Sequence, residues 1–209
     1  MLENLALLAL GCLIGIVTPA IVEAIRSRRE TEAVLAAVKS ELNEIAYRLV
    51  LASYNITMHL GTSDRAYLKW VQDAMILYQG NQPTDSIADY IATQLSLSDS
   101  LLAAYVAKEA ATGVKALVLP KFCLPFIDAR VPSWHAIPAV IRLELLAIHS
   151  DIDLLNDVVD QTRTYFSLTF TLEGRNHATV VENLRGAYLQ FGKRCRIAAD
   201  RMHRLHSML

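Results

Sequence analysis

Hydrophobic and polar residues follow two patterns along this chain, an uninterrupted apolar run and then a longer helical period. Asn4 to Val22 contain no charged side chain, and Arg26, Arg28 and Arg29 follow almost at once. A helix rises about 1.5 Å per residue, so this run is just long enough to cross a hydrocarbon core of about 30 Å. No second apolar run of this length follows. We therefore predict a transmembrane anchor over residues 1–25 and one further domain over residues 26–209.

Charges on either side of the run predict the orientation of the anchor. Met1 to Asn4 are acidic overall, whereas a cleaved signal peptide begins with a basic region. Thr18 to Ala20 form a poor cleavage site, so we expect the anchor to stay uncleaved. Arginines favour the cytoplasmic side of a membrane span. We expect a single-pass protein of the inner (plasma) membrane, with its N-terminus outside, its domain in the cytoplasm and membrane lipid as one partner.

After the anchor, apolar residues recur in alternating steps of three and four. This a/d pattern predicts a helix that continues out of the anchor. It is typical of a parallel coiled coil between copies, or of an amphipathic helix packed inside its own domain. A GxxxG motif within the anchor permits close helix approach in lipid and so favours a homo-oligomer. The candidate self-association residues are Gly11, Gly15, Leu35, Val38, Leu42, Ile45 and Leu49.

Turn-forming residues divide the rest of the chain into further helices. Gly61 to Ser63 are predicted to end the first helix, with Ser63 capping the next. The stretch from Lys115 to Ile127 is too apolar for an ordinary loop, and we expect it to cover the core or to contact a neighbour or the bilayer surface. Tyr165 to Leu172 alternate weakly, which fits a strand or a helix. The fold class is predicted to be all-α, a helical bundle.

Composition excludes several kinds of site. The formal net charge is −1, which gives no overall attraction to nucleic acid. Three cysteines (Cys12, Cys123 and Cys195) form no CxxC pair and predict no disulfide framework. Phosphate-binding glycine loops and HExxH are absent from the sequence. His203 and His206 are too few for a metal site, so we expect neither a metal nor a cofactor.

Arginine–histidine spacings supply the one hint of catalysis. Arg142 and His149 are seven residues apart, as are Arg196 and His203, and a shorter spacing joins Arg201 to His206. This resembles the R-x4–6-H pattern of HEPN ribonucleases, although the polar residue that usually follows the arginine is missing. The resemblance implies that two protomers bring arginine and histidine together and cleave RNA without a metal. Histidine moves protons near neutral pH, and arginine stabilises charge on a phosphate. The candidate catalytic residues are Arg142, His149, Arg196 and His203.

The layout of the whole chain, an N-terminal anchor and a helical domain, also resembles small membrane accessory proteins of RNA-targeting CRISPR and other anti-phage systems. That resemblance implies ring-shaped oligomers, pores and a role in antiviral defence. Our leading hypothesis is a non-enzymatic, membrane-anchored helical protein that acts by homo-oligomerisation or by tethering a protein partner. The alternatives are a membrane-tethered HEPN-like RNase and an accessory subunit of a larger membrane complex. RNA is not the favoured partner.

Two charged segments are expected to meet. Acidic residues lie between Asp151 and Asp160, and basic residues accumulate from Lys193 to Arg204. If their helices are antiparallel, complementary charge sets the register between them or between two protomers. Asp153, Asp157 and Asp160 would then face Arg194, Arg201 and Arg204. The remaining alternatives for the basic segment are anionic lipid and RNA.

Overall fold

A computed structural model describes residues 2–80, 82–112, 117–130 and 137–209, without the side chains of 2–17, 20, 85, 112 and 130. These residues form helices and contain no strand, which confirms the all-α class. Tyr165 to Leu172 begin within a helix and end in a turn. The elements are α1 (Leu2–His59), α2 (Arg65–Leu77), α3 (Asp85–Ser96), α4 (Asp99–Thr112), α5 (Pro125–Arg130), α6 (Ala139–Leu168) and α7 (Gly174–Met208).

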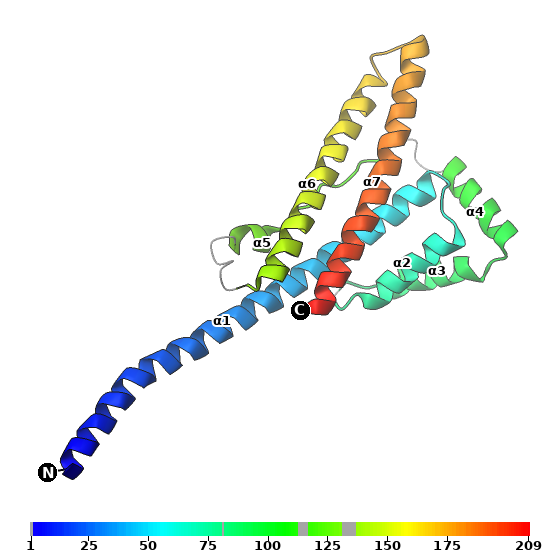
Figure 1. Cartoon of the computed structure of the whole chain (residues 1–209). Helices are drawn as coiled ribbons and strands as arrows, with labels where there is room; N and C mark the ends of the chain where they lie inside the picture. The colour runs from blue at the N-terminus through cyan, green and yellow to red at the C-terminus, as the bar shows by residue number, and fades with distance from the viewer. Residues whose placement is uncertain (1, 81, 113–116, 131–136) are drawn as a thin grey trace.

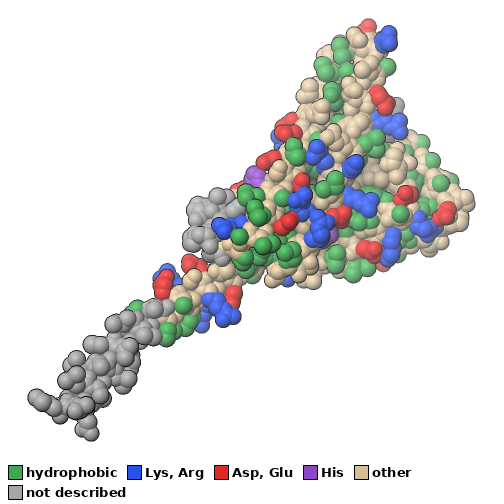
Figure 2. Space-filling view, viewed as in Figure 1, with side chains coloured by type: hydrophobic (Ala, Val, Ile, Leu, Met, Phe, Trp, Pro, Cys, Tyr) green, Lys and Arg blue, Asp and Glu red, His purple; other side chains and the backbone are tan. Residues whose placement is uncertain are grey.

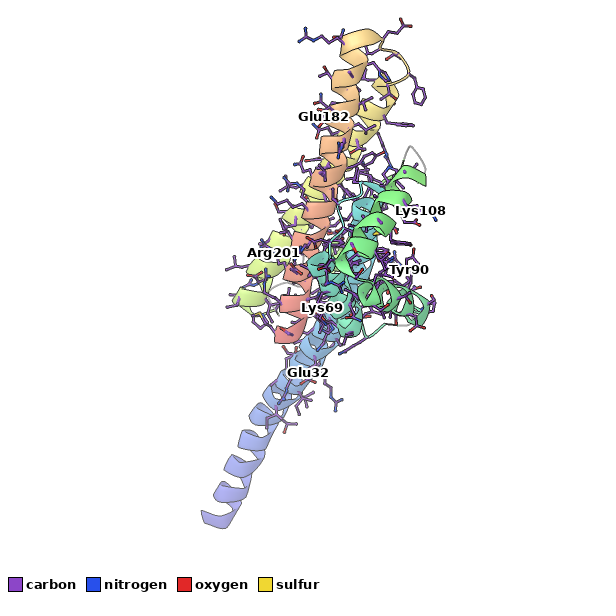
Figure 3. All side chains as sticks on the ribbon, turned by 90° about the vertical axis from the view of Figure 1, so that its right-hand side faces the viewer. Glu32, Lys69, Tyr90, Lys108, Glu182 and Arg201 are labelled. Atoms are coloured by element: carbon purple, nitrogen blue, oxygen red, sulfur yellow. The ribbon has the colours of Figure 1, made fainter. Side chains whose placement is uncertain are left out.

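Helix α1 has two different environments along its 58 residues (Figure 1). Its N-terminal part extends away from the rest of the molecule, and its C-terminal part lies inside the domain. Figure 3 shows the same arrangement from the side, with Glu32 near the level where the helix leaves the domain. Burial begins at Val34 and continues to Met58. One helix therefore passes from an isolated segment directly into the core.

The core is formed by α1 and an antiparallel hairpin of α6 and α7. Helix α7 packs on both α1 and α6. The far end of the hairpin projects beyond the other helices (Figures 1 and 3). Helices α2, α3 and α4 pack on the other side of α1. The largest fully buried side chains come from α1, α2, α3, α6 and α7 and from the region of α5, and include Leu42, Leu68, Ile91, Leu145, Leu155, Phe191 and Met202.

The a/d seam of α1 packs against the core of its own chain. Val38, Leu42 and Leu49 have at most 1 % of their surface exposed, Ile45 is also buried, and Leu35 packs partly buried against the same core. An amphipathic helix inside its own domain, one of the two alternatives for this pattern, is therefore observed. These five side chains do not face outward for a coiled coil between copies. Gly11 and Gly15 lie outside the residues whose side chains are described.

The end of α1 shows how the sequence sets helix boundaries. Gly61 has φ of 69°, and the Thr62 N–H donates to the Thr57 carbonyl at 3.0 Å. This is the Schellman arrangement, which favours glycine because a side chain strains a positive φ. Asp64, and not Ser63 as predicted, caps α2 by accepting from the Tyr67 N–H at 2.7 Å. Ser63 is buried instead.

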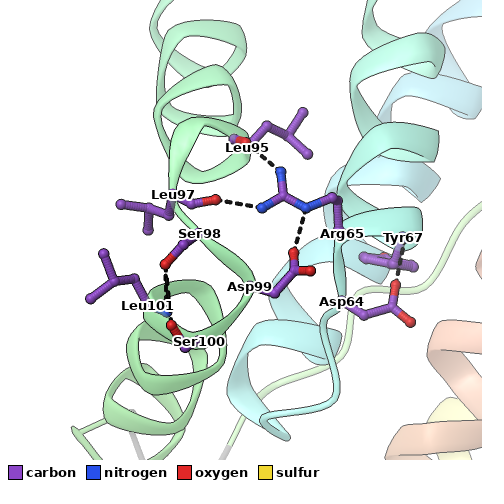
Figure 4. A network of polar contacts seen from close by, with 9 residues as sticks. All are labelled: Asp64, Arg65, Tyr67, Leu95, Leu97, Ser98, Asp99, Ser100 and Leu101. Atoms are coloured by element: carbon purple, nitrogen blue, oxygen red, sulfur yellow. Dashed lines mark hydrogen bonds and ion pairs between the residues drawn. The ribbon is translucent and has the colours of Figure 1, made fainter.

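A single arginine joins α2 to the two helices that follow it (Figure 4). Arg65 Nε donates to Asp99 Oδ1 at 2.7 Å, and its other nitrogens donate to the carbonyls of Leu95 and Leu97 at the end of α3. Arg65 thus satisfies carbonyls that have no partner within their own helix, where the helix dipole also favours a cation. This contact fixes α3 and α4 relative to α2.

Candidate functional site

The segment where α1 leaves the domain combines exposed apolar and basic side chains. Ile21, Val22 and Ile25 are 52 %, 58 % and 49 % exposed, and Arg26 to Arg29 follow on the next turn. Figure 2 shows side chains of both charges nearest the domain and hydrophobic side chains beyond them. No helix in the described part of the chain has an apolar stretch long enough to cross a membrane. Most of the predicted anchor, Asn4 to Val22, lies outside the described side chains.

His149 bridges two helices through carboxylates. Its Nε2 lies 3.1 Å from Asp128 Oδ1 on α5, and its Nδ1 lies 3.0 Å from Asp153 Oδ2 on α6. Each ring nitrogen therefore lies within hydrogen-bonding distance of a carboxylate oxygen, and these contacts occupy both nitrogens. A general base needs a free nitrogen to take a proton. His149 therefore serves as a link between α5 and α6. Arg142 lies two turns away from it on α6.

Arg196 is held by aromatic side chains. Its guanidinium carbon lies 5.0 Å from the centre of the Trp70 ring and 6.0 Å from that of Tyr67. Trp70 Nε1 donates to Asp200 Oδ1 at 2.7 Å, so α2 contacts two successive turns of α7. Among the described residues, no hydrogen bond or ion pair joins Arg196 to His203 or Arg142 to His149. One chain therefore does not bring either candidate pair into direct contact.

The predicted contact between the acidic and basic segments forms at one position. Helices α6 and α7 are antiparallel neighbours, and Arg201 Nε lies 2.9 Å from Asp151 Oδ2. The register differs from the prediction, because Asp153 faces His149 and Asp160 faces Lys121 at 2.7 Å. The prediction failed because it ignored the segment of residues 117–124 and α5, which approach α6 from its other side.

Basic residues of α7 that do not face α6 are exposed. Lys193, Arg196 and Arg204 lie on the outer side of the helix. In Figure 2, lysine and arginine side chains gather over the middle of the domain, with acidic side chains between them. The basic segment is therefore divided between the contact with α6, the aromatic rings of α2 and solvent.

The apolar stretch after α4 covers the core. We call residues 117–124, which precede α5, the strap. Leu119, Phe122 and Leu124 are buried, whereas Val118 is 88 % exposed. Covering the core was one of the alternatives for this stretch, and it is the one observed.

Three polar side chains hold the strap and α5, and none was identified from the sequence. Tyr188 Oη donates to the Leu117 carbonyl at 2.9 Å and accepts from its N–H at 3.2 Å. Asn156 pairs with both backbone groups of Phe122, at 2.8 and 3.0 Å. Glu41 accepts from the first free N–H groups of α5, at 2.8 and 3.0 Å. Backbone groups that lack a partner in regular structure are thereby satisfied.

Three half-buried histidines make stability depend on pH. Burial lowers the pKa of His59, His203 and His206; Asp200 opposes this at His203, and Lys39 adds to it at His206. Between the folded and unfolded pKa values the unfolded chain binds more protons. The free energy of unfolding should therefore be highest above about pH 6.5, the pKa of histidine in the unfolded chain. It should fall as the pH is lowered from there through the lower pKa values of the folded state.

Denaturant titrations of the full chain in detergent at pH 7.5 and 5.5 measure this dependence. We expect His203→Gln to reduce the loss between the two values, because one of the shifted groups is gone. A free energy of unfolding that rises toward pH 5.5, or a loss unchanged by His203→Gln, would contradict this assignment.

No protein-family model, curated protein or solved structure matches this chain. The function of this chain must therefore be inferred from the positions of its own side chains.

Proposed function

We propose that this chain is a non-enzymatic, single-pass membrane protein that acts by self-association or by holding a protein partner at the inner membrane. The observation that carries the proposal is the continuity of α1. One helix contains the apolar run, an exposed junction and a buried half that packs against α7. A pore or an accessory role in anti-phage defence rests only on the resemblance in layout.

The junction supports a membrane boundary near Ile25. Exposed apolar side chains on an isolated helix are costly in water and favourable in lipid. They are followed by Arg26, Arg28 and Arg29, whose long side chains reach the head-group region from such a position. Arg28 Nε donates to Glu32 Oε1 at 2.9 Å, which supports the helix just outside that boundary.

A continuous helix would couple the anchor to the domain more tightly than a flexible linker. Rotation or tilt of the anchor would reach the α1–α7 contact directly, because no glycine or proline lies between Val22 and Val34. Partners bound to the domain would thus be held at a defined height above the bilayer. Self-association would use the anchor, where Gly11 and Gly15 permit close packing, since the a/d seam is occupied.

The contacts of His149 and Arg196 favour a non-enzymatic role. His149 is held by two carboxylates, and Arg196 lies over the Trp70 ring. A HEPN-like RNase would have to break these contacts when two protomers meet. Metal-independent RNA cleavage by the purified full chain, lost in His149→Ala or His203→Ala, would contradict the proposal.

Reporter fusions after Leu209 test the orientation in a bacterial host. We expect a fluorescent fusion to be bright and an alkaline phosphatase fusion to be inactive, because the phosphatase needs disulfides that do not form in the cytoplasm. Replacing Arg26, Arg28 and Arg29 with glutamine should weaken this preference. High phosphatase activity with the natural arginines would overturn the orientation.

A further inference from the structure

A cavity of about 390 Å³ lies between α1, the strap and Phe191 of α7. Its volume is within the range of sites that hold small molecules. Ile45, Ile56 and Phe191 line it from the core, and Leu119 and Phe122 line it from the strap; all five side chains are buried. A ligand in this cavity would therefore place apolar atoms against the core.

The strap is held in a position that keeps the cavity open. Tyr188 fixes its first residue and Asn156 fixes Phe122, each through both backbone groups. Because the strap is tied to α6 and α7, it cannot move onto α1 and fill the space without losing these bonds. The site is thus preformed, which lowers the cost of binding.

Polar groups of the lining point to an anionic head group. Arg48, Asn55 and Lys121 line the cavity and are exposed, and the lining contains no carboxylate. Arg48 pairs with Glu44 at 3.0 Å, but Glu44 also accepts from Tyr78 Oη at 2.8 Å.

If Arg48 turned away, Glu44 would thus keep a hydrogen-bond partner. Lys121 can likewise leave Asp160, because Arg163 lies 3.6 Å from the same carboxylate. Exposed ion pairs contribute only about 0–1 kcal/mol each. Both cations can therefore turn to a ligand at little cost and leave each carboxylate with a partner.

We infer that this cavity binds a single-chain anionic amphiphile, with the acyl chain against Ile56 and Phe191 and the head group between Arg48 and Lys121. A free fatty acid and a lysophospholipid share this chemistry. The inference does not depend on the proposed membrane anchor, because it rests on contacts within the domain.

Cys123 provides a reporter, because it lines the cavity and is an exposed free thiol. The test uses the full chain with Cys12→Ser in nanodiscs, free of detergent; Cys195 is buried and should not react. We expect saturating laurate or lysophosphatidic acid to slow the reaction of Cys123 with Ellman's reagent by tenfold or more. Whichever of the two anions protects Cys123 at the lower concentration shows whether the site prefers a free fatty acid or a lysophospholipid. If neither laurate nor lysophosphatidic acid protects Cys123, the inference is overturned.

Matched controls separate the site from a general effect of amphiphiles. A chain with Cys12→Ser, Cys123→Ser and Ser150→Cys carries its reactive thiol on the exposed side of α6, and laurate should leave the rate of that thiol unchanged. Arg48→Gln with Lys121→Gln should raise the laurate concentration for half-protection about tenfold. Dodecanol should protect poorly in the natural chain.

Ala52→Phe, which fills the cavity, should abolish protection while circular dichroism stays unchanged. If Ala52→Phe does not fold, the double glutamine variant decides. Protection of the thiol in the Ser150→Cys control, equal protection by dodecanol, or full protection in either cavity variant would each overturn the inference.

Discussion

Replacing Gly192 with valine is expected to lower the free energy of unfolding by about 1–3 kcal/mol, because the new side chain overfills a close contact between helices. Gly192 is buried where α7 meets α1, and a Cβ there would lie 3.3 Å from Ile56 Cγ2. Its carbonyl also accepts from Ser53 Oγ at 3.0 Å. The helices would have to separate, and this bond would lengthen.

Gly186 on the same helix provides the matched control. A Cβ at Gly186 meets no atom within 4 Å, and the residue is exposed. Gly186→Ala should raise the free energy of unfolding by about 0.5–1 kcal/mol, since alanine favours the helix without a clash. Denaturant titration of both variants in detergent gives the comparison. Equal effects of the two substitutions would show that helix propensity, and not the α1–α7 contact, decides stability at Gly192.

Local features of the fold could be predicted from the sequence. The period-3.6 pattern of Leu42 and Leu49, or of Leu145 and Leu155, needs only the neighbouring residues to show a buried helix face. Gly61 marked the end of α1 because a positive φ there is a local requirement. These predictions succeeded because each depends on one turn or one helix.

Contacts between distant segments could not be predicted. Tyr188 and Leu117 are 71 residues apart, and Glu41 and Phe126 are 85 apart. No local pattern distinguishes Glu41 from the other glutamates of α1, because its role depends on where α5 begins. The same limit explains why Asp151, and not Asp153 or Asp157, faces Arg201. Charge complementarity indicated that α6 and α7 meet, but the neighbours of each carboxylate set the register.

The catalytic candidates illustrate the limits of spacing as a signal. Seven residues place Arg142 and His149 on one side of α6, yet the same side faces α5 and Asp128. Trp70, which contacts both Arg196 and Asp200, was not identified because it lies 130 residues from Asp200. A pattern on one helix does not show what the next helix places against it.

The paired substitution Leu10→Arg and Leu13→Arg should release the full chain from membranes. Both positions lie near the centre of the apolar run. An arginine at the centre of a transmembrane helix costs about 2.5–3.5 kcal/mol, so two cost about 5–7 kcal/mol. The buried half of α1 begins only at Val34, so the folded domain should remain intact.

Leu143→Arg with Leu146→Arg adds the same charge to α6, at side chains that are 68 % and 53 % exposed. This control should leave both folding and membrane association unchanged. It separates the effect of charge within the anchor from a general effect of added arginines on solubility.

The fraction of full chain that stays in the membrane pellet after alkaline carbonate extraction tests the anchor most directly. We predict that the natural chain and the Leu143/Leu146 control remain in the pellet, while the Leu10/Leu13 variant moves to the supernatant as a folded helical protein. Extraction of the natural chain by carbonate, or retention of the Leu10/Leu13 variant in the pellet, would contradict a transmembrane anchor formed by the start of α1.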